Sequence, residues 1–213
     1  MNGFADYLKL VNKQGGINGV KVVTEECEFA YNTARGVECY ERLKGKHGGA
    51  SALLPWSSAV TIALTDKAYE DKISIITPGF GSSFADGSAY KWNFPLTGTH
   101  WASADLQIQY LAKKEGGFDK LKGKKITQLY FDSAYGKEAH AVFEQRAKMH
   151  GFVLETIPVT SPGLDQKSAW LQIRRSQPDY VLLWGWGVMN PTALREARAT
   201  GFPASKIVGL FTS

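Results

Sequence analysis

The residues that could do chemistry in this chain follow its predicted strands, and they carry groups suited to binding. Ser57 and Ser58 follow one strand, and the backbone amides of Gly79, Phe80 and Gly81 follow the next. The aromatic side chains that follow three later strands are Tyr135, Trp186 and Phe211. Hydroxyls and backbone N–H groups suit an anion, and aromatic rings cover an apolar body. Because ligands of open α/β sheets bind at the carboxyl ends of strands, these loops predict a small-molecule site.

The clearest of these loops lies between residues 178 and 201. Residues 180–183 are wholly apolar, which is typical of a parallel strand covered on both faces. Pro191 stands where a helix starts, and Gly201 stands where a helix ends. Trp184 and Trp186 lie at or just past the end of the strand, so an aromatic loop is expected at the carboxyl edge of a sheet.

Motifs of common enzyme classes are missing from the sequence. The loop at residues 79–81 begins like a dinucleotide-binding loop, but residue 84 is Phe where the third glycine belongs. There is no P-loop, no G-x-S-x-G segment and no H-E-x-x-H segment. The four histidines do not cluster along the chain, and the two cysteines match no zinc motif. We therefore expect a binding protein with no catalytic residue, cofactor or metal.

Composition and charge exclude two further classes. The chain has 25 basic and 20 acidic side chains, a net charge of +5, and the basic residues are scattered. Nucleic-acid binding requires a basic stripe and a recognised module, so no nucleic-acid partner is expected. No apolar run reaches the roughly 18 residues that a membrane-spanning helix needs.

Apolar periodicity predicts strands that alternate with helices. The expected helices lie at residues 4–11, 33–43, 60–69, 104–112, 138–150, 167–176 and 192–200, and the expected strands at 20–24, 50–54, 73–77, 125–131, 152–158, 180–183 and 207–210. This alternation indicates βαβ units and parallel sheets, so the fold class is α/β. An extended segment at about 90–100 interrupts it and predicts a crossing between lobe 1 (1–95) and lobe 2 (96–213).

The two cysteines leave two interpretations open. Cys27 falls at the end of a predicted strand, and Cys39 falls inside the following helix. Because such a helix packs back on its sheet, the two thiols either form a disulfide or remain two buried small side chains.

Six segments, in order along nearly the whole chain, resemble the type I periplasmic solute-binding proteins of ABC importers, in the leucine/isoleucine/valine-binding branch. They are residues 12–19 (NKQGGING), Ser57-Ser58, 75–78 (IITP), 132–136 (DSAYG), Pro178-Asp179 and 195–201 (REARATG). The resemblance implies a two-lobed clamshell in which each lobe is a parallel sheet flanked by helices. The family's first strand and its C-terminal segments have no counterpart here, so we expect a partial sequence.

The resemblance also assigns ligand contacts one at a time. The family serine falls on Ser57 or Ser58, which would bind the ligand carboxylate. The next strand-end loop supplies backbone donors at Gly79 and Gly81. The positions of the family's two pocket tyrosines are Tyr135 and Trp186, and Trp184 is expected to pack inside the lobe.

Two departures from the family pattern change the expected ligand. The family's acidic residues, which balance a ligand ammonium, fall on or near His100, beside Trp101, and on or near Phe211. An ammonium buried without a countercharge is costly. The resulting pocket is aromatic and lacks acids, so an aromatic or apolar carboxylate fits better than an amino acid, and His100 adds a donor to the anion.

These observations predict a periplasmic solute receptor that captures a small carboxylate between two lobes. By resemblance, it would act as a monomer and dock on the membrane permease of an ABC importer. Two alternatives stay open. The first is a branched-chain amino-acid binder of the same family, and the second is a ligand-sensing regulatory domain with the same fold.

Overall fold

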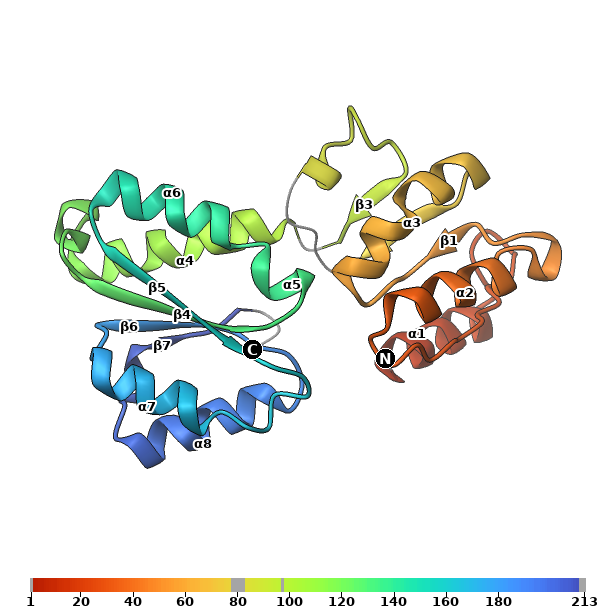
Figure 1. The fold of residues 1–213 in the computed structure, drawn as a ribbon. Helices are drawn as coiled ribbons and strands as arrows, with labels where there is room; N and C mark the ends of the chain where they lie inside the picture. Colours follow the sequence, from red (N-terminus) through yellow and green to blue (C-terminus); the bar gives the residue numbers. More distant parts are fainter. Residues whose placement is uncertain (1, 78–82, 97, 211–213) are drawn as a thin grey trace. The chain divides into compact units, whose positions relative to one another are not determined.

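The computed structural model describes residues 2–77, 83–96 and 98–210 of the chain (Figure 1). The chain divides into two compact units, Met1–Ala50 and Ser51–Ser213. The first unit contains helices α1 (Asn2–Lys13) and α2 (Thr33–Leu43) and a short 3-10 turn, η1 (Lys46–Gly48). Helix α2 has the predicted bounds because Asn32 caps it, its side chain accepting a hydrogen bond from the Arg35 N–H at 3.0 Å.

The strand predicted at residues 20–24 is wrong. Val20 forms only an isolated bridge with Ile17, and residues 21–24 belong to no ladder among the described residues. The Asn12 side chain satisfies Val22 instead, donating to its carbonyl and accepting from its N–H, both at 2.7 Å. A β-branched run forms a strand only beside a neighbouring strand, and here a side chain takes the neighbour's place.

The second unit contains two parallel sheets. The smaller has the order β1 (Ala52–Leu53), β2 (Ser74–Thr77), β3 (Asn93–Pro95), with helix α3 (Ser58–Asp71) between β1 and β2 along the chain. The expected crossing segment therefore contributes a strand, β3, that the sequence did not predict. Pro95 has no N–H to donate, which an edge strand tolerates, and the ladder continues through the Leu96 N–H to the Thr77 carbonyl at 2.8 Å.

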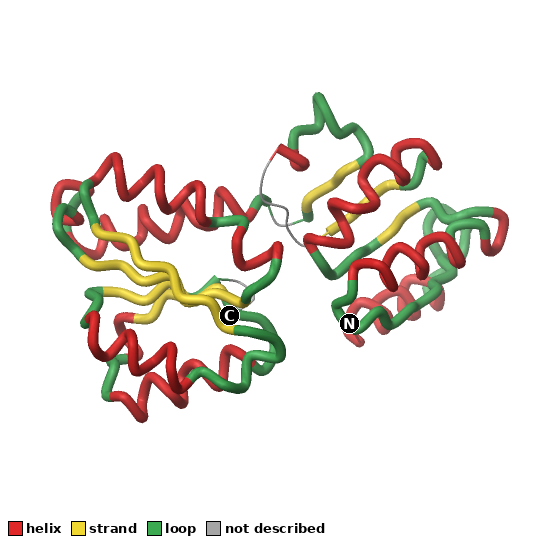
Figure 2. Tube along the Cα trace, in the orientation of Figure 1, coloured by secondary structure: helices red, strands yellow, loops and turns green. Residues whose placement is uncertain are grey.

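The larger sheet has four parallel strands in the order β5-β4-β6-β7. Its strands are β4 (Lys125–Phe131), β5 (Val153–Val159), β6 (Tyr180–Trp184) and β7 (Ile207–Val208). Figures 1 and 2 show α4 (His100–Glu115) and α6 (His140–His150) on one face, and α7 (Lys167–Ser176) and α8 (Met189–Thr200) on the other. The short helix α5 (Ala134–Lys137) follows β4 directly and was not predicted, and the helix predicted at 138–150 begins two residues later, as α6.

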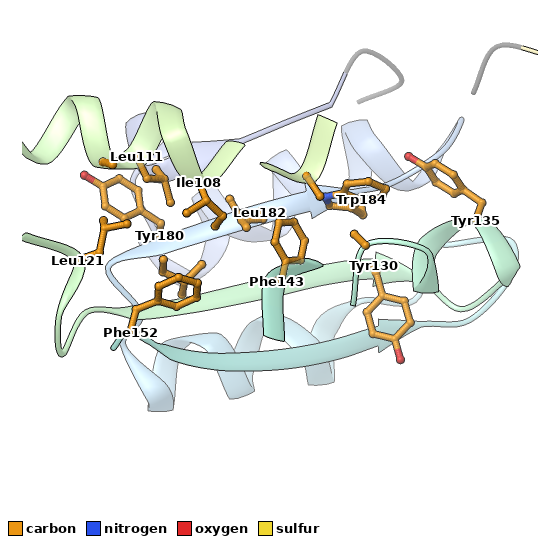
Figure 3. Packing of buried hydrophobic residues seen from close by; sticks show 14 residues of the cluster. Ile108, Leu111, Leu121, Tyr130, Tyr135, Phe143, Phe152, Tyr180, Leu182 and Trp184 are labelled. Carbon is orange, nitrogen blue, oxygen red and sulfur yellow. The ribbon is translucent and has the colours of Figure 1, made fainter. Parts of the chain in front are cut away.

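Strict alternation along β6 divides the core into two clusters. Tyr180, Leu182 and Trp184 point to the α4–α6 face, and Figure 3 shows them among the aromatic and aliphatic side chains of that cluster. Val181 and Leu183 point to the α7–α8 face. Every residue of the strand is buried, as its apolar run predicts for a strand covered on both faces.

The predicted boundary between lobe 1 (1–95) and lobe 2 (96–213) stays a prediction. Strands β1–β3 precede residue 96 and strands β4–β7 follow it, whereas the compact units divide between Ala50 and Ser51.

The disulfide interpretation is the one that the structure bears out. Cys27 and Cys39 are bonded, with a Cα–Cα distance of 5.9 Å, and they close a loop of sequence separation 12 within the first unit.

We expect the double variant Cys27→Ser/Cys39→Ser to lose about 3 kcal/mol of unfolding free energy, measured by denaturant titration, because the unfolded chain is released from the cross-link. A reducing agent should destabilise the wild type but leave the double variant unchanged. Equal unfolding free energies of the wild type and the double variant in the absence of a reducing agent would contradict the expectation.

A charged cluster joins β6 to α4 near the start of the strand. Glu115 accepts hydrogen bonds from the Tyr180 hydroxyl and, at 3.0 Å, from Lys124 Nζ. These two bonds hold the pKa of Glu115 below its ordinary value of 4.5. Burial, followed by the bond to Glu115, raises the pKa of Tyr180 to about 12.

A lowered carboxyl pKa makes this cluster sensitive to acid. The stabilisation by ionised Glu115 is fully present above its unfolded-state pKa and is lost as the pH falls through the lowered folded-state pKa. We therefore expect Glu115→Gln to be less stable than wild type at neutral pH and to lose less stability on acidification. Melting temperatures recorded from neutral pH down to about pH 3 would test this. Parallel pH profiles for the two proteins would argue against it.

Candidate ligand-binding site

The candidate site lies at the carboxyl edge of the four-stranded sheet, where α4 begins. Thr99 caps α4, its hydroxyl accepting from the Ala102 N–H at 3.0 Å. The cap places His100 and Trp101 in the first turn of the helix. His100 is 4% exposed, whereas Trp101 is 40% exposed. Adjacent residues of one helix point in different directions, so the two predicted ligand residues occupy different environments.

The turn after β4 places Tyr135 in the same region. Ser133 caps α5 by accepting from the Gly136 N–H at 3.3 Å. Gly136 lies so close to the end of β4 that a Cβ atom there would stand 2.0 Å from the Phe131 carbonyl oxygen. Tyr135 is buried and donates its hydroxyl to the Gly185 carbonyl at 3.3 Å. The Tyr-Gly pair therefore has a local physical reason: glycine permits the tight turn that aims the tyrosine toward β6.

Three rings meet at this edge. The His100 ring centroid lies 5.1 Å from that of Tyr135 and 5.9 Å from that of Trp184, both edge-to-face. Tyr135 and Trp184 are themselves 5.8 Å apart, and Figure 3 shows them together at the end of the core farthest from Tyr180. Trp184 is fully buried, which confirms that it packs in the lobe.

An acid lies beside His100, which the expectation of a pocket without acids did not include. Glu138 Oε2 lies 2.8 Å from His100 Nδ1, and their side chains are 10% and 5% exposed. The Trp101 indole N–H also donates to the Glu138 backbone carbonyl at 2.9 Å. Sequence reasoning missed Glu138 because it lies 38 residues from His100. The only available signal was its position three residues after Tyr135, one helical turn farther on.

Gln107 was also missed, and it links the site to β7. Its side-chain oxygen accepts from the Trp184 indole N–H at 2.8 Å. Its amide nitrogen donates to the carbonyls of Val208 and Gly209, at 3.2 and 3.0 Å. The buried indole thus has an acceptor, and the end of β7 is tied to α4.

Ser57 and Ser58 lie at the start of α3 and are buried. Ser57 is the N-cap, with its hydroxyl oxygen 3.4 Å from the Val60 nitrogen. The neighbouring Trp56 lies against Trp186, with ring centroids 6.3 Å apart, and sequence reasoning gave Trp56 no role. Trp186 is half-buried and packs against the cluster that contains Trp184.

Four predicted ligand residues lie outside the described residues. They are Gly79, Phe80, Gly81 and Phe211. Their roles, like those of the other predicted ligand residues, stay predictions.

In the described part of the chain, no group of three or more His, Cys, Asp or Glu side chains could hold a metal ion. Within the same residues, no helix has both the length and the apolar character needed to cross a membrane. One surface hollow of about 510 Å³ lies beside Tyr110 and Phe118, and another of about 240 Å³ lies beside Tyr69 and Trp92. Neither hollow is lined by a predicted ligand residue.

The Gln107 bridge generates a stability prediction. Gln107→Ala would leave the buried Trp184 N–H without its acceptor and release the end of β7. We expect it to lower the unfolding free energy by about 1–3 kcal/mol, measured by denaturant titration. Gln109→Ala is the matched control, because Gln109 lies on the same helix but is exposed. Equal stabilities of the two variants would refute the role of the bridge.

Comparison with known proteins identifies relatives along the whole chain. Residues 1–213 match the family described as "Periplasmic binding protein". The Leu/Ile/Val-binding protein homolog 3 of Brucella melitensis biotype 1 is 21% identical over 203 residues, which are 95% of this chain and 53% of the relative. A crystal structure described as an ABC transporter permease from the Pseudomonas fluorescens group is 43% identical, with a TM-score of 0.79, and the match covers 97% of this chain and 51% of that one.

A third similar protein has a bound ligand. It is a solute-binding protein of an ABC transporter from R. palustris, in complex with benzoate, and it is 20% identical with a TM-score of 0.78. The match covers 95% of this chain and 55% of that protein. The chain thus spans about half the length of these relatives. The predicted α/β class with parallel sheets is confirmed, and the chain belongs to the periplasmic binding protein family, as its resemblance to the leucine/isoleucine/valine-binding branch predicted.

Proposed function

We propose that this chain is part of an extracytoplasmic solute receptor of an ABC importer, and that its ligand is a small carboxylate with an aromatic or apolar body. One observation carries the proposal: the buried His100 ring joins an acid to an aromatic cluster at the carboxyl edge of the sheet. This is the edge at which open α/β sheets bind ligands.

The aromatic residues support an apolar ligand body. Trp56 and Trp186 are half-buried indoles that lie against each other, so both keep surface that a ligand ring can cover. Aromatic pairs prefer offset or edge-to-face contacts with centroids about 4.5–7 Å apart. A benzoate-sized ring beside Trp186 would meet that preference.

The polar residues support an anionic head group. Ser57 and Ser58 begin α3, a helix of 14 residues, and the N-terminus of a helix favours negative charge. His100 adds an imidazole, whose N–H groups donate to anions. Benzoate bound to a relative with this fold is consistent with such a ligand, although at 20% identity that relative establishes only the fold.

The charge arrangement disfavours an amino acid. Glu138 is bonded to His100, so a ligand ammonium would have to share the same carboxylate. Burying an ammonium without a full countercharge is costly. An acid is therefore present near the predicted ligand residues, but it is bonded to His100.

A branched-chain amino acid is the second candidate. The Brucella melitensis relative is named for leucine, isoleucine and valine, and Glu138 supplies a carboxylate near the predicted ligand residues. A ligand that displaced His100 from Glu138 would gain the countercharge that an ammonium requires.

The remaining elements of the proposal come from the family. We propose a periplasmic location, a monomer and docking of the ligand-bound receptor on a membrane permease. The mechanism would be capture and release of the ligand, without a cofactor or a covalent step.

Calorimetry on the full-length protein tests the ligand class. We expect benzoate or 4-hydroxycinnamate to bind and leucine to bind weakly or not at all. Tight leucine binding without a response to either aromatic acid would overturn the proposal and favour the second candidate.

Two variants locate the binding. Trp186→Leu removes the indole at the predicted wall and should weaken binding of the aromatic acid roughly tenfold, about 1.4 kcal/mol. Trp92→Phe is the control, because Trp92 lies beside a surface hollow away from the predicted residues. Equal affinity of both variants and the wild type would exclude Trp186 from the site.

A further inference from the structure

We propose that Glu138 is a positioning residue that determines ligand specificity: it orients His100 and balances the charge of the imidazole when a carboxylate binds. The inference rests on the proposed function and names one further residue of the same site. Neither the family resemblance nor the sequence pattern assigned Glu138 a role.

Glu138 is held at two points by consecutive residues of the first turn of α4. Its side chain bonds His100 Nδ1 at 2.8 Å, and its backbone carbonyl accepts from Trp101 Nε1 at 2.9 Å. The second bond fixes the backbone from which the Glu138 side chain reaches His100, so the carboxylate is placed independently of the imidazole.

The Glu138 carboxylate accepts hydrogen bonds, so the imidazole nitrogen beside it carries the hydrogen. Glu138 therefore assigns the N–H to Nδ1 and fixes the plane of the ring, which Tyr135 and Trp184 also contact.

When His100 carries a hydrogen on both ring nitrogens, it forms a neutral pair with ionised Glu138, and both side chains are at most 10% exposed. A ligand carboxylate would add one negative charge beside the imidazolium. A neutral amide of the same shape would gain much less from that charge, and a zwitterion would compete with His100 for Glu138. The pair therefore selects acids that lack an ammonium.

The experiment compares a carboxylate with its neutral analogue. In the full-length protein, Glu138→Gln keeps a hydrogen-bonding side chain but removes the charge. We expect it to weaken benzoate binding roughly tenfold, because charge-assisted hydrogen bonds are about twice as strong as neutral ones. Binding of benzamide should be unchanged. Glu144→Gln, at an exposed position of α6, is the matched control and should affect neither ligand.

Two further measurements separate positioning from a structural role. Nitrogen NMR shifts of His100 should show both ring nitrogens protonated in benzoate-bound wild type but not in Glu138→Gln. Glu138→Asp keeps the charge and should bind benzoate more tightly than Glu138→Gln. It also keeps the inference testable when Glu138→Gln does not fold. Loss of benzoate and benzamide affinity in equal proportion by both variants would overturn the inference.

The outcomes distinguish the two proposals. Benzoate binding by the wild type that Glu138→Gln leaves unchanged would overturn this inference alone. Leucine binding by the wild type that Glu138→Gln abolishes would overturn both, because Glu138 would then be the ammonium countercharge.

Discussion

The complete burial of β6 is the constraint on which the rest of the second unit depends. A strand covered on both faces must be apolar throughout, and its alternation sends Trp184 to one cluster and Leu183 to the other. Trp184 ends the strand and carries a buried N–H that requires an acceptor. Gln107 supplies the acceptor and, through its amide, holds the end of β7. Packing of one strand thus decides where α4 and β7 lie.

The same edge of the sheet carries a buried histidine–carboxylate pair. Burying polar groups is costly unless they are hydrogen-bonded with good geometry. The Thr99 cap places His100, the Trp101 indole holds the Glu138 backbone, and the two side chains meet at 2.8 Å. A pair of this kind is weak evidence for stability, and its position beside the predicted ligand residues favours a role in recognition.

Sequence patterns predicted the bounds of helices and strands correctly where residues close by in the chain determine those bounds. The segments α2, β4 and α7 have the predicted bounds, and at α2 the Asn32 cap marks the start. The patterns failed where a distant partner decides. Residues 20–24 are rich in β-branched side chains but have no ladder partner among the described residues. Pro95 lies in β3, an edge strand, where a residue without an N–H is tolerated.

The sequence by itself determined the α/β class, the alternation of strands and helices, and the strand-end loops that carry serines and aromatic rings. These features depend on period-2 and period-3.6 patterns and on turn residues, which act over a few positions. Only the tertiary structure decided that Glu138 meets His100 and that Gln107 meets Trp184. Such pairs are 38 and 77 residues apart, and their contact depends on how helices pack across a sheet, a geometry that no local pattern encodes.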